Sequence, residues 1–159
     1  DEIVLCTRNG MAIRFKETDV RPMGRTASGV RGITLRDDDE VIGMAAVEPS
    51  ATLLTVCEHG YGKRTKFEEY RCQSRGGTGI INIRTTGRNG KVVAVKTVRD
   101  EDEMVLITEK GMVVRIGVND IRTIGRATQG VRLIGLDEDD RVVGLAKIEA
   151  DDSAAEGIE

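Results

Sequence analysis

Aromatic side chains are scarce in this chain. Among 159 residues there is no tryptophan, and there are only two tyrosines, two phenylalanines and one histidine. So few aromatic residues argue against a surface that stacks the bases of single-stranded nucleic acid. The histidine, His59, precedes Gly60 at a predicted hairpin tip, where an exposed turn residue is expected rather than a catalytic base. The two tyrosines lack a basic nucleophile context, so we expect them to be packing residues.

Cysteines and long apolar runs are also few. Three cysteines, an odd number in unrelated registers, predict no disulfide framework, and Cys6 is expected to be a small buried hydrophobic residue. No run is apolar enough for a signal peptide or a membrane span, so we expect a cytoplasmic protein with no membrane partner. No acidic cluster has metal-site spacing beyond the solvated turns, so no metal, cofactor or catalytic residue is predicted. The chain starts at Asp1 in the middle of a pattern, and we expect it to be a piece of a longer protein.

One pattern occurs in three copies about fifty residues apart. Gly10, Gly60 and Gly111 mark its period. Residues 2–47 align without a gap on residues 103–148, and almost half of the aligned pairs are identical. Such a long ungapped match predicts repeated structural units. We predict three units and a tail: a blade at 1–49, a blade at 50–101, a blade at 102–148 and an acidic disordered tail at 149–159.

Each copy is expected to hold four short strands and no helix. Asn9-Gly10 supplies the positive φ of a tight hairpin turn, and the residues that follow alternate between apolar and polar. A third strand is expected at 30–35, 80–85 and 131–136, and a fourth at 40–47, 91–98 and 141–148. Four strands per fifty residues predict an all-β fold of four-stranded, propeller-like blades. Three blades cannot close a ring, so we expect either further blades elsewhere or two associated copies.

Arginines recur at fixed offsets in all three copies. The first set is Arg14, Arg64 and Arg115, the second Arg21, Arg71 and Arg122, and the third Arg25, Arg75 and Arg126. The guanidinium fork fits phosphate oxygens, and the glycines beside the arginines allow close backbone approach. We therefore favour phosphate binding, and we predict that the first and third sets lie on one continuous outer surface. The alternative is that these arginines cap the blades or pair with the acidic turns.

The charges are sorted along the chain. Net charge is −3, but five of the 27 acidic residues lie in 149–159, which contains no lysine or arginine. The remainder of the chain is therefore mildly basic, with about two positive charges in excess. Its acids collect in turns at 37–40, 100–103 and 137–140, away from the arginine loops.

The arginine loop of the middle copy resembles a known motif. Gln73-Ser74-Arg75-Gly76-Gly77-Thr78-Gly79 is similar to the box Q-R-R-G-G-K-G of the C-terminal domain of the DNA gyrase A subunit. Ser74 and Thr78 replace two bases, so the full box is expected in a blade outside this chain. The stretches 20–24, 29–33, 59–65 and 125–131 and the acidic tail also resemble that family.

The resemblance implies a β-pinwheel: a six-bladed disc, of which this chain is three blades, whose blades exchange strands with their neighbours. In the family the basic rim bends duplex DNA, independently of base sequence, so that the holoenzyme introduces negative supercoils. The implied partners are double-stranded DNA, the remainder of the gyrase A subunit, and through that remainder the gyrase B subunit. The implied location is the bacterial nucleoid. The candidate DNA-binding residues are Arg14, Arg21, Arg25, Lys63, Arg64, Lys66, Arg71, Arg75, Arg115, Arg122 and Arg126.

Three other functions are compared with this one. The C-terminal domain of the topoisomerase IV A subunit is the close relative, but its blades are usually fewer and their boxes more eroded. A protein-interaction propeller of the WD-repeat or kelch kind would show aromatic or Trp-Asp signatures in each blade, and these are absent. A propeller enzyme would need a buried set of acids, bases or metal ligands, which no copy contains.

Overall fold

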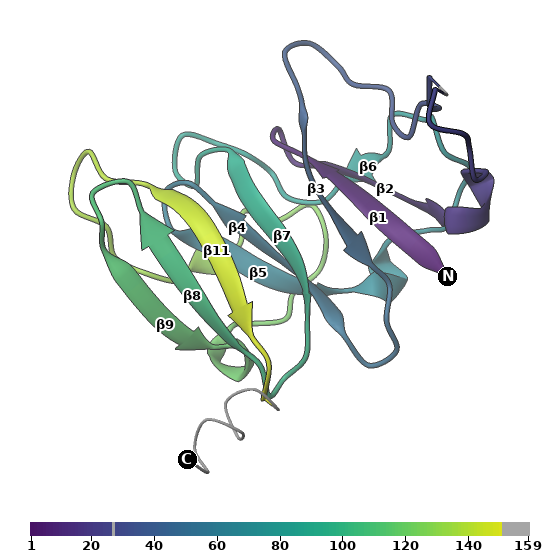
Figure 1. The fold of residues 1–159 in the computed structure, drawn as a ribbon. Coiled ribbons are helices and arrows are strands. Elements are labelled where there is room, and N and C mark those ends of the chain that lie inside the picture. The colour runs from purple at the N-terminus through teal and green to yellow at the C-terminus, as the bar shows by residue number, and fades with distance from the viewer. Residues whose placement is uncertain (27, 151–159) are drawn as a thin grey trace.

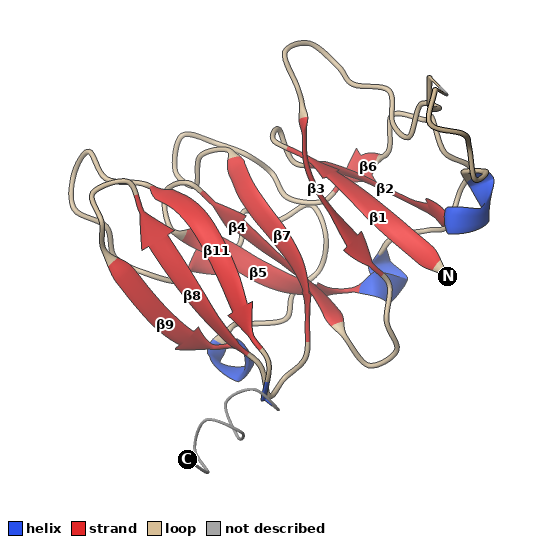
Figure 2. Cartoon of the chain, viewed as in Figure 1, coloured by secondary structure: helices blue, strands red, loops and turns tan. Residues whose placement is uncertain are grey.

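The computed structural model of the protein describes residues 1–26 and 28–150, and it consists of short strands and loops (Figures 1 and 2). The strands are β1 (Glu2–Thr7), β2 (Met11–Lys16), β3 (Val41–Ala46), β4 (Thr52–Cys57), β5 (Tyr61–Lys66), β6 (Ile80–Ile81), β7 (Val92–Val98), β8 (Glu103–Thr108), β9 (Val113–Gly117), β10 (Val131–Arg132) and β11 (Val142–Ile148). The helices are three single turns of 3-10 helix: η1 (Glu17–Asp19), η2 (Phe67–Glu69) and η3 (Val118–Asp120). The prediction of an all-β fold is confirmed. Most of the predicted acidic tail, from residue 151 onward, lies outside the described residues.

The strands form three antiparallel sheets that lie side by side (Figure 1). The strand orders are β3-β1-β2-β6, β10-β5-β4-β7 and β11-β8-β9. Strand β7 contacts both β3 and β11, so these three strands form the inner side of the row. Strands β6 and β10 lie at the opposite edges of their sheets, on the outer side.

Neighbouring repeats exchange a strand. The edge strand β6 belongs to the second repeat but pairs with β2 of the first, with Met11 opposite Ile81. In the same way β10 of the third repeat pairs with β5 of the second, with Val131 opposite Gly62. Each of these two sheets is therefore completed by the repeat that follows it, as the resemblance implies.

The prediction of the third strands is wrong: two of them are shorter than expected, and in the first copy no strand forms. Strands β6 and β10 have only two residues each, and residues 30–35 form no strand. The strands are short because the backbone soon turns to bond the following loop, as where the Arg84 N–H donates to the Thr128 carbonyl at 2.8 Å. Residues 30–35 have no preceding repeat in this sequence to pair with. The predicted fourth strands are confirmed as β3, β7 and β11.

Two apolar cores lie between the sheets, and we call these regions the first and second junctions. The first junction, between the first and second sheets, contains Val4, Cys6 and Leu53. The second junction, between the second and third sheets, contains Leu54 and Leu106. Successive residues of β4 thus face opposite neighbouring sheets, because side chains alternate between the two faces of a strand. Cys6 is buried as expected, and its burial raises the pKa of the thiol to about 12.

Candidate nucleic-acid interface

The first arginine set reaches forward to the next repeat. Arg14 Nη1 donates to the Phe67 carbonyl at 2.8 Å and to the Tyr70 carbonyl at 3.2 Å. Arg64 Nε donates to the Ile121 carbonyl at 2.9 Å. Tyr70 and Ile121 are equivalent residues, each directly following a 3-10 helix. The two arginines therefore tie their sheet to the corresponding point of the next blade.

The same arginines are paired with acids. Arg14 lies 3.0 Å from Glu2, Arg64 2.6 Å from Asp100, and Arg115 2.6 Å from Glu103. The hydrogen bond from Arg14 lowers the pKa of Glu2 to about 2, and a hydrogen bond from Cys72 acts in the same direction. The side chains of Arg14 and Arg64 are 16% and 7% exposed, whereas that of Arg115 is 53% exposed.

The prediction of an outer surface is therefore wrong for Arg14 and Arg64. Arg14 is opposite Val4 in the sheet register and Arg64 is opposite Leu54, so both side chains point toward the next blade. In these two positions the alternative, that the arginines cap blades and pair with acids, describes the structure.

The third set reaches backward to the preceding repeat. Arg75 Nε donates to the Asp19 carbonyl at 3.1 Å, and its Nη1 donates to the Arg31 carbonyl at 3.0 Å. Arg126 makes the equivalent bonds, at 2.8 Å to Glu69 and at 2.9 Å to Ile81. Both side chains are half-buried by this contact. Arg25, whose repeat has no predecessor in the sequence, is exposed.

The second set differs from the other two. Arg21, Arg71 and Arg122, here called the rim arginines, are exposed. Across residues 1–26 and 28–150 their side chains have no hydrogen-bond or ion-pair partner, so the full donor fork of each faces solvent. Lys66 is also exposed. The rim arginines are thus the one repeated basic set whose side chains make no hydrogen bond or ion pair within the described residues.

Lys63 does not lie at the surface. It is opposite Thr55 in the register, faces the first junction and is fully buried. Its Nζ donates to the carbonyl oxygens of Asn82 at 2.5 Å and Gly125 at 2.9 Å, and to Thr128 Oγ1 at 3.2 Å. Burial lowers the pKa of Lys63 to about 8. Its predicted place among the DNA-binding residues is corrected, since no atom of the side chain is accessible.

The box-like loop at 73–79 lies across the first repeat. The Gln73 N–H donates to the Arg14 carbonyl at 2.8 Å, and the Gly76 N–H donates to the Gly32 carbonyl at 2.6 Å. Gly79 has a φ of +78°, and a Cβ atom there would clash with the Ala12 carbonyl oxygen. The glycines of this loop therefore serve the contact between blades. Ser74 and Thr78 remain exposed.

Comparison with known proteins decides the family. The family model of the DNA gyrase C-terminal domain, a beta-propeller, matches residues 1–48, 51–99 and 102–149. The chain belongs to this family. The DNA gyrase A subunit of Haloquadratum walsbyi is 50% identical over 146 residues, covering 91% of this chain and 17% of that protein. The DNA gyrase A subunit of Staphylococcus aureus (strain MRSA252) is 45% identical over 153 residues, covering 95% of this chain and 17% of that protein.

Solved structures agree on the fold of this gyrase C-terminal domain family. A C-terminal domain of DNA topoisomerase IV superposes with a TM-score of 0.89 at 27% identity, covering 99% of this chain and 50% of that one. A DNA gyrase A C-terminal domain superposes with a TM-score of 0.87, also at 27% identity, covering 94% and 51%. The propeller-like fold is thus confirmed, and the chain spans about half of these solved domains. The number of six blades stays a prediction.

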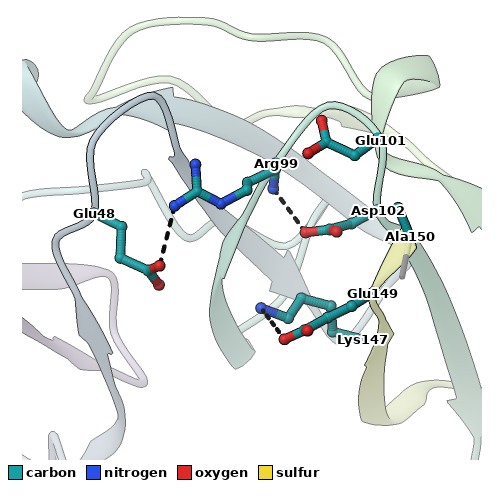
Figure 3. Close-up of a pocket in the computed structure, with 7 residues that line it drawn as sticks. All are labelled: Glu48, Arg99, Glu101, Asp102, Lys147, Glu149 and Ala150. Carbon is teal, nitrogen blue, oxygen red and sulfur yellow. Dashed lines mark hydrogen bonds and ion pairs between the residues drawn. The ribbon is translucent and has the colours of Figure 1, made fainter. Parts of the chain in front are cut away.

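One cluster of acidic residues of this gyrase-family chain lies on the inner side, at the ends of β3, β7 and β11. A pocket of about 220 Å³ is lined by Glu48, Arg99, Glu101, Asp102, Lys147, Glu149 and Ala150 (Figure 3). Arg99 pairs with Glu48 at 3.1 Å and Lys147 pairs with Glu149 at 3.6 Å. Here the two bases are neutralised by a larger number of carboxylates. Such a surface repels a polyanion.

Two arginines outside the predicted set also occupy an open position. Arg88 and Arg132 lie over the ring of Tyr61. The only sequence signal for them is the extra residue of the middle repeat near Arg88. In the described part of the chain no three or more histidine, cysteine or acidic side chains could hold a metal ion, and no helix is long and apolar enough to cross a membrane.

Proposed function

We propose that this chain is a non-catalytic DNA-binding and DNA-wrapping part of a DNA gyrase A subunit. It bends duplex DNA around its basic rim, so that the holoenzyme introduces negative supercoils. The parent protein then resembles an ATP-dependent type II topoisomerase, in which the B subunit, with the rest of the A subunit, carries the chemistry. The same proposal places the chain in the cytoplasm, at the bacterial nucleoid.

The observation that carries the proposal is the set of rim arginines. One exposed, unpartnered arginine follows the 3-10 helix at the same position of each blade: Arg21, Arg71 and Arg122. Equivalent positions on adjacent blades form a row along the outer side, and a row of cations suits the regular phosphates of a duplex. Arginine contacts to phosphate carry no base information, so the binding is independent of sequence.

A second candidate, the corresponding domain of topoisomerase IV, is favoured by the TM-score of 0.89 with that structure. The solved gyrase A domain is also 27% identical, so the two structures do not separate the candidates, and the gyrase A subunits that are 45% and 50% identical favour gyrase. A protein-interaction propeller is supported by no comparable feature. The proposal for gyrase is the stronger one.

The test is a wrapping assay on closed circular DNA. The chain is incubated with relaxed plasmid, a nicking-closing topoisomerase removes the strain, and the change in linking number is read on a gel. Wrapping of one hand leaves a one-sided shift that grows with protein concentration. A protein-interaction propeller leaves the distribution unchanged.

Matched variants separate wrapping from folding. Arg71→Ala and Arg122→Ala remove exposed, unpaired cations, whereas Arg99→Ala removes a cation that is paired with Glu48 on the inner side. The rim variants are expected to reduce the shift while Arg99→Ala retains it. Equal shifts in all three variants overturn the role of the rim.

A further inference from the structure

The outer edge of the second sheet carries one arrangement that the repeat does not predict. Tyr61, at the start of β5, has the guanidinium carbon of Arg88 5.6 Å from its ring centroid and that of Arg132 5.8 Å away. Arg88 comes from the loop before β7, whereas Arg132 belongs to β10 of the following repeat and is opposite Tyr61 in the register. Two segments therefore bring two cations to one aromatic ring.

The two guanidinium groups are held but not neutralised. Arg88 Nε donates to the Tyr61 hydroxyl at 3.2 Å. The hydrogen bond from Arg88, followed in size by the one from Arg132, holds the pKa of Tyr61 below its usual value. Within the described ranges neither arginine has an ion pair. The negative face of the ring offsets part of the repulsion between the cations, but most of their N–H donors stay unused.

A hollow opens beside the cations. It measures about 460 Å³ and is lined by Tyr61, Arg88, Gln129, Gly130, Val131 and Arg132, with no carboxylate among them. A neighbouring hollow that shares Tyr61 and both arginines does contain Asp137 and Asp140. The Asp140 carboxylate accepts the backbone N–H groups of Lys110 and Arg141. An anion is therefore favoured in the first hollow and disfavoured in the second.

The arrangement is specific to the second sheet. The positions equivalent to Tyr61 are Met11 and Met112, and the partner opposite Met11 is Ile81 instead of an arginine. The first repeat has aspartates, Asp37 to Asp39, in the region that corresponds to Arg88. At the equivalent edge of the first sheet the register pairs two apolar residues, Met11 and Ile81, so the fold forms this edge without a cation cluster.

We propose that Tyr61, Arg88 and Arg132 form a clamp for a backbone phosphate of duplex DNA, at one point of the rim. The clamp rests on the proposed function, and it adds a fixed contact that the repeated rim arginines do not provide. Gly130 and Arg132 directly continue the loop that begins at Arg122, so the clamp and a rim arginine belong to one segment. The repeated arginines follow the duplex, and the clamp holds it at the outer edge of the second sheet.

The first arm of the test observes Tyr61 directly. The chain has two tyrosines, and Tyr70 is 1% exposed. With tyrosine labelled by ¹³C at Cζ, the Tyr61→Phe variant assigns the two signals. Adding a short duplex is expected to shift the Tyr61 signal and leave that of Tyr70 in place, because phosphate draws the guanidinium donors away from the hydroxyl. Inorganic phosphate at the same phosphate concentration is expected to cause a much smaller shift.

The second arm measures affinity. Arg88→Gln and Arg132→Gln are each expected to weaken duplex binding by about tenfold and to flatten the slope of log K against log salt by about 1. Arg99→Gln, which removes the same charge on the inner side, is the matched control and is expected to change affinity by less than about twofold. Circular dichroism of each variant confirms that the strands are retained.

The outcomes separate the clamp from the proposed function. If duplex DNA binds and Arg71→Gln weakens it, but Arg88→Gln and Arg132→Gln bind as the unmodified chain does, the clamp is wrong and the rim stands. An equal Tyr61 shift with inorganic phosphate also overturns the clamp, since the ligand is then a small anion. If the chain binds no duplex at low salt, the proposed function itself fails.

Discussion

The first and second junctions contain equivalent bridging arginines but different buried side chains. Each is bridged by two arginines that donate to equivalent backbone carbonyls, Arg14 with Arg75 in the first and Arg64 with Arg126 in the second. The filling of the first junction includes the buried polar residues Thr55, Lys63, Tyr70 and Asn82. Their equivalents at the second junction are Leu106, Val114, Ile121 and Leu133, all of which belong to or pack on its apolar core.

The difference shows what holds the blades in register. Backbone carbonyls recur with the fold, so an arginine directed at them recurs as well. Side-chain partners are free to change as long as the junction is filled. At the first junction the Tyr70 hydroxyl donates to Asn82 Oδ1, and the Asn82 amide donates to Thr55 Oγ1 at 3.0 Å. This network satisfies polar groups that the second junction does not contain.

The largest effect is expected from the glycines that let the loops approach. Gly79 and Gly130 have φ values of +78°, and a Cβ atom on Gly130 would lie 2.7 Å from the Gly62 carbonyl oxygen. Gly79→Ala and Gly130→Ala should each lower the free energy of unfolding by about 4 kcal/mol, through backbone strain and overlap together. Gly29 has a φ of +79° but no atom within 4 Å of such a Cβ. Gly29→Ala should therefore cost only about 1 kcal/mol in urea titration, and equal losses at the three sites would contradict the close approach.

The next prediction concerns the pH dependence of stability, because the first junction contains the buried amine of Lys63 where the second contains Val114. The folded-state pKa of Lys63, about 8, is below the usual value of 10.5, so folding favours the neutral amine. The contribution of Lys63 to the free energy of unfolding should therefore rise between pH 8 and pH 10.5, by on the order of 3 kcal/mol. Buried Cys6 and Cys57, whose pKa is raised from 9.0 to about 12, contribute a fall above pH 9, so the rise is read as the difference between the unmodified chain and a variant without Lys63. Lys63→Met should abolish this rise, because methionine does not titrate. Guanidinium titrations at several pH values measure both proteins, and a rise that survives the substitution would assign it to another group.

The loss of stability on substituting Arg64, Arg14 or Arg115 by alanine should follow the order in which these side chains are buried. Arg64→Ala should lower the free energy of unfolding by about 2 kcal/mol, because the buried Ile121 carbonyl loses a donor. Arg14→Ala should cost about 1 kcal/mol, since that side chain is more exposed. Arg115→Ala, at the exposed equivalent position, should stay within about 0.5 kcal/mol of the unmodified chain. Thermal melts of the three variants test the order, and a loss at Arg115 equal to that at Arg64 would refute it.

The smallest effect on stability is expected for the rim arginines, whose substitution should change DNA binding and not the fold. Arg71→Ala should leave the melting temperature unchanged and flatten the salt slope of duplex binding by about 1. Arg75→Ala, four residues along the same loop, should instead lower the melting temperature, because two carbonyls of the first repeat lose their donor. Anisotropy titrations at several salt concentrations, on two unrelated duplex sequences, make the comparison. Losses that depend on the base sequence would exclude a phosphate contact.

The repeat made much of the fold predictable. The period of glycines placed the hairpin turns, and Gly10, Gly60 and Gly111 all have positive φ. Alternation placed the long strands to within about a residue. Residues 30–35, 80–85 and 131–136 were harder, because a strand that completes a neighbouring sheet has the same local pattern as one that pairs within its own repeat.

The sequence by itself determined the all-β fold, the three repeats and the fact that three arginines recur in each. Only the tertiary structure decided that Arg21, Arg71 and Arg122 are exposed along the outer side, while four others are directed at neighbouring blades: Arg14, Arg64, Arg75 and Arg126. Strand alternation says that Arg14 and Arg64 share a face with Val4 and Leu54, but it does not say which blade covers that face. Their acceptors are carbonyl groups more than fifty residues away, as from Arg14 to Phe67 and from Arg64 to Ile121. Packing of one sheet on the next brings these atoms together, and no local pattern records it.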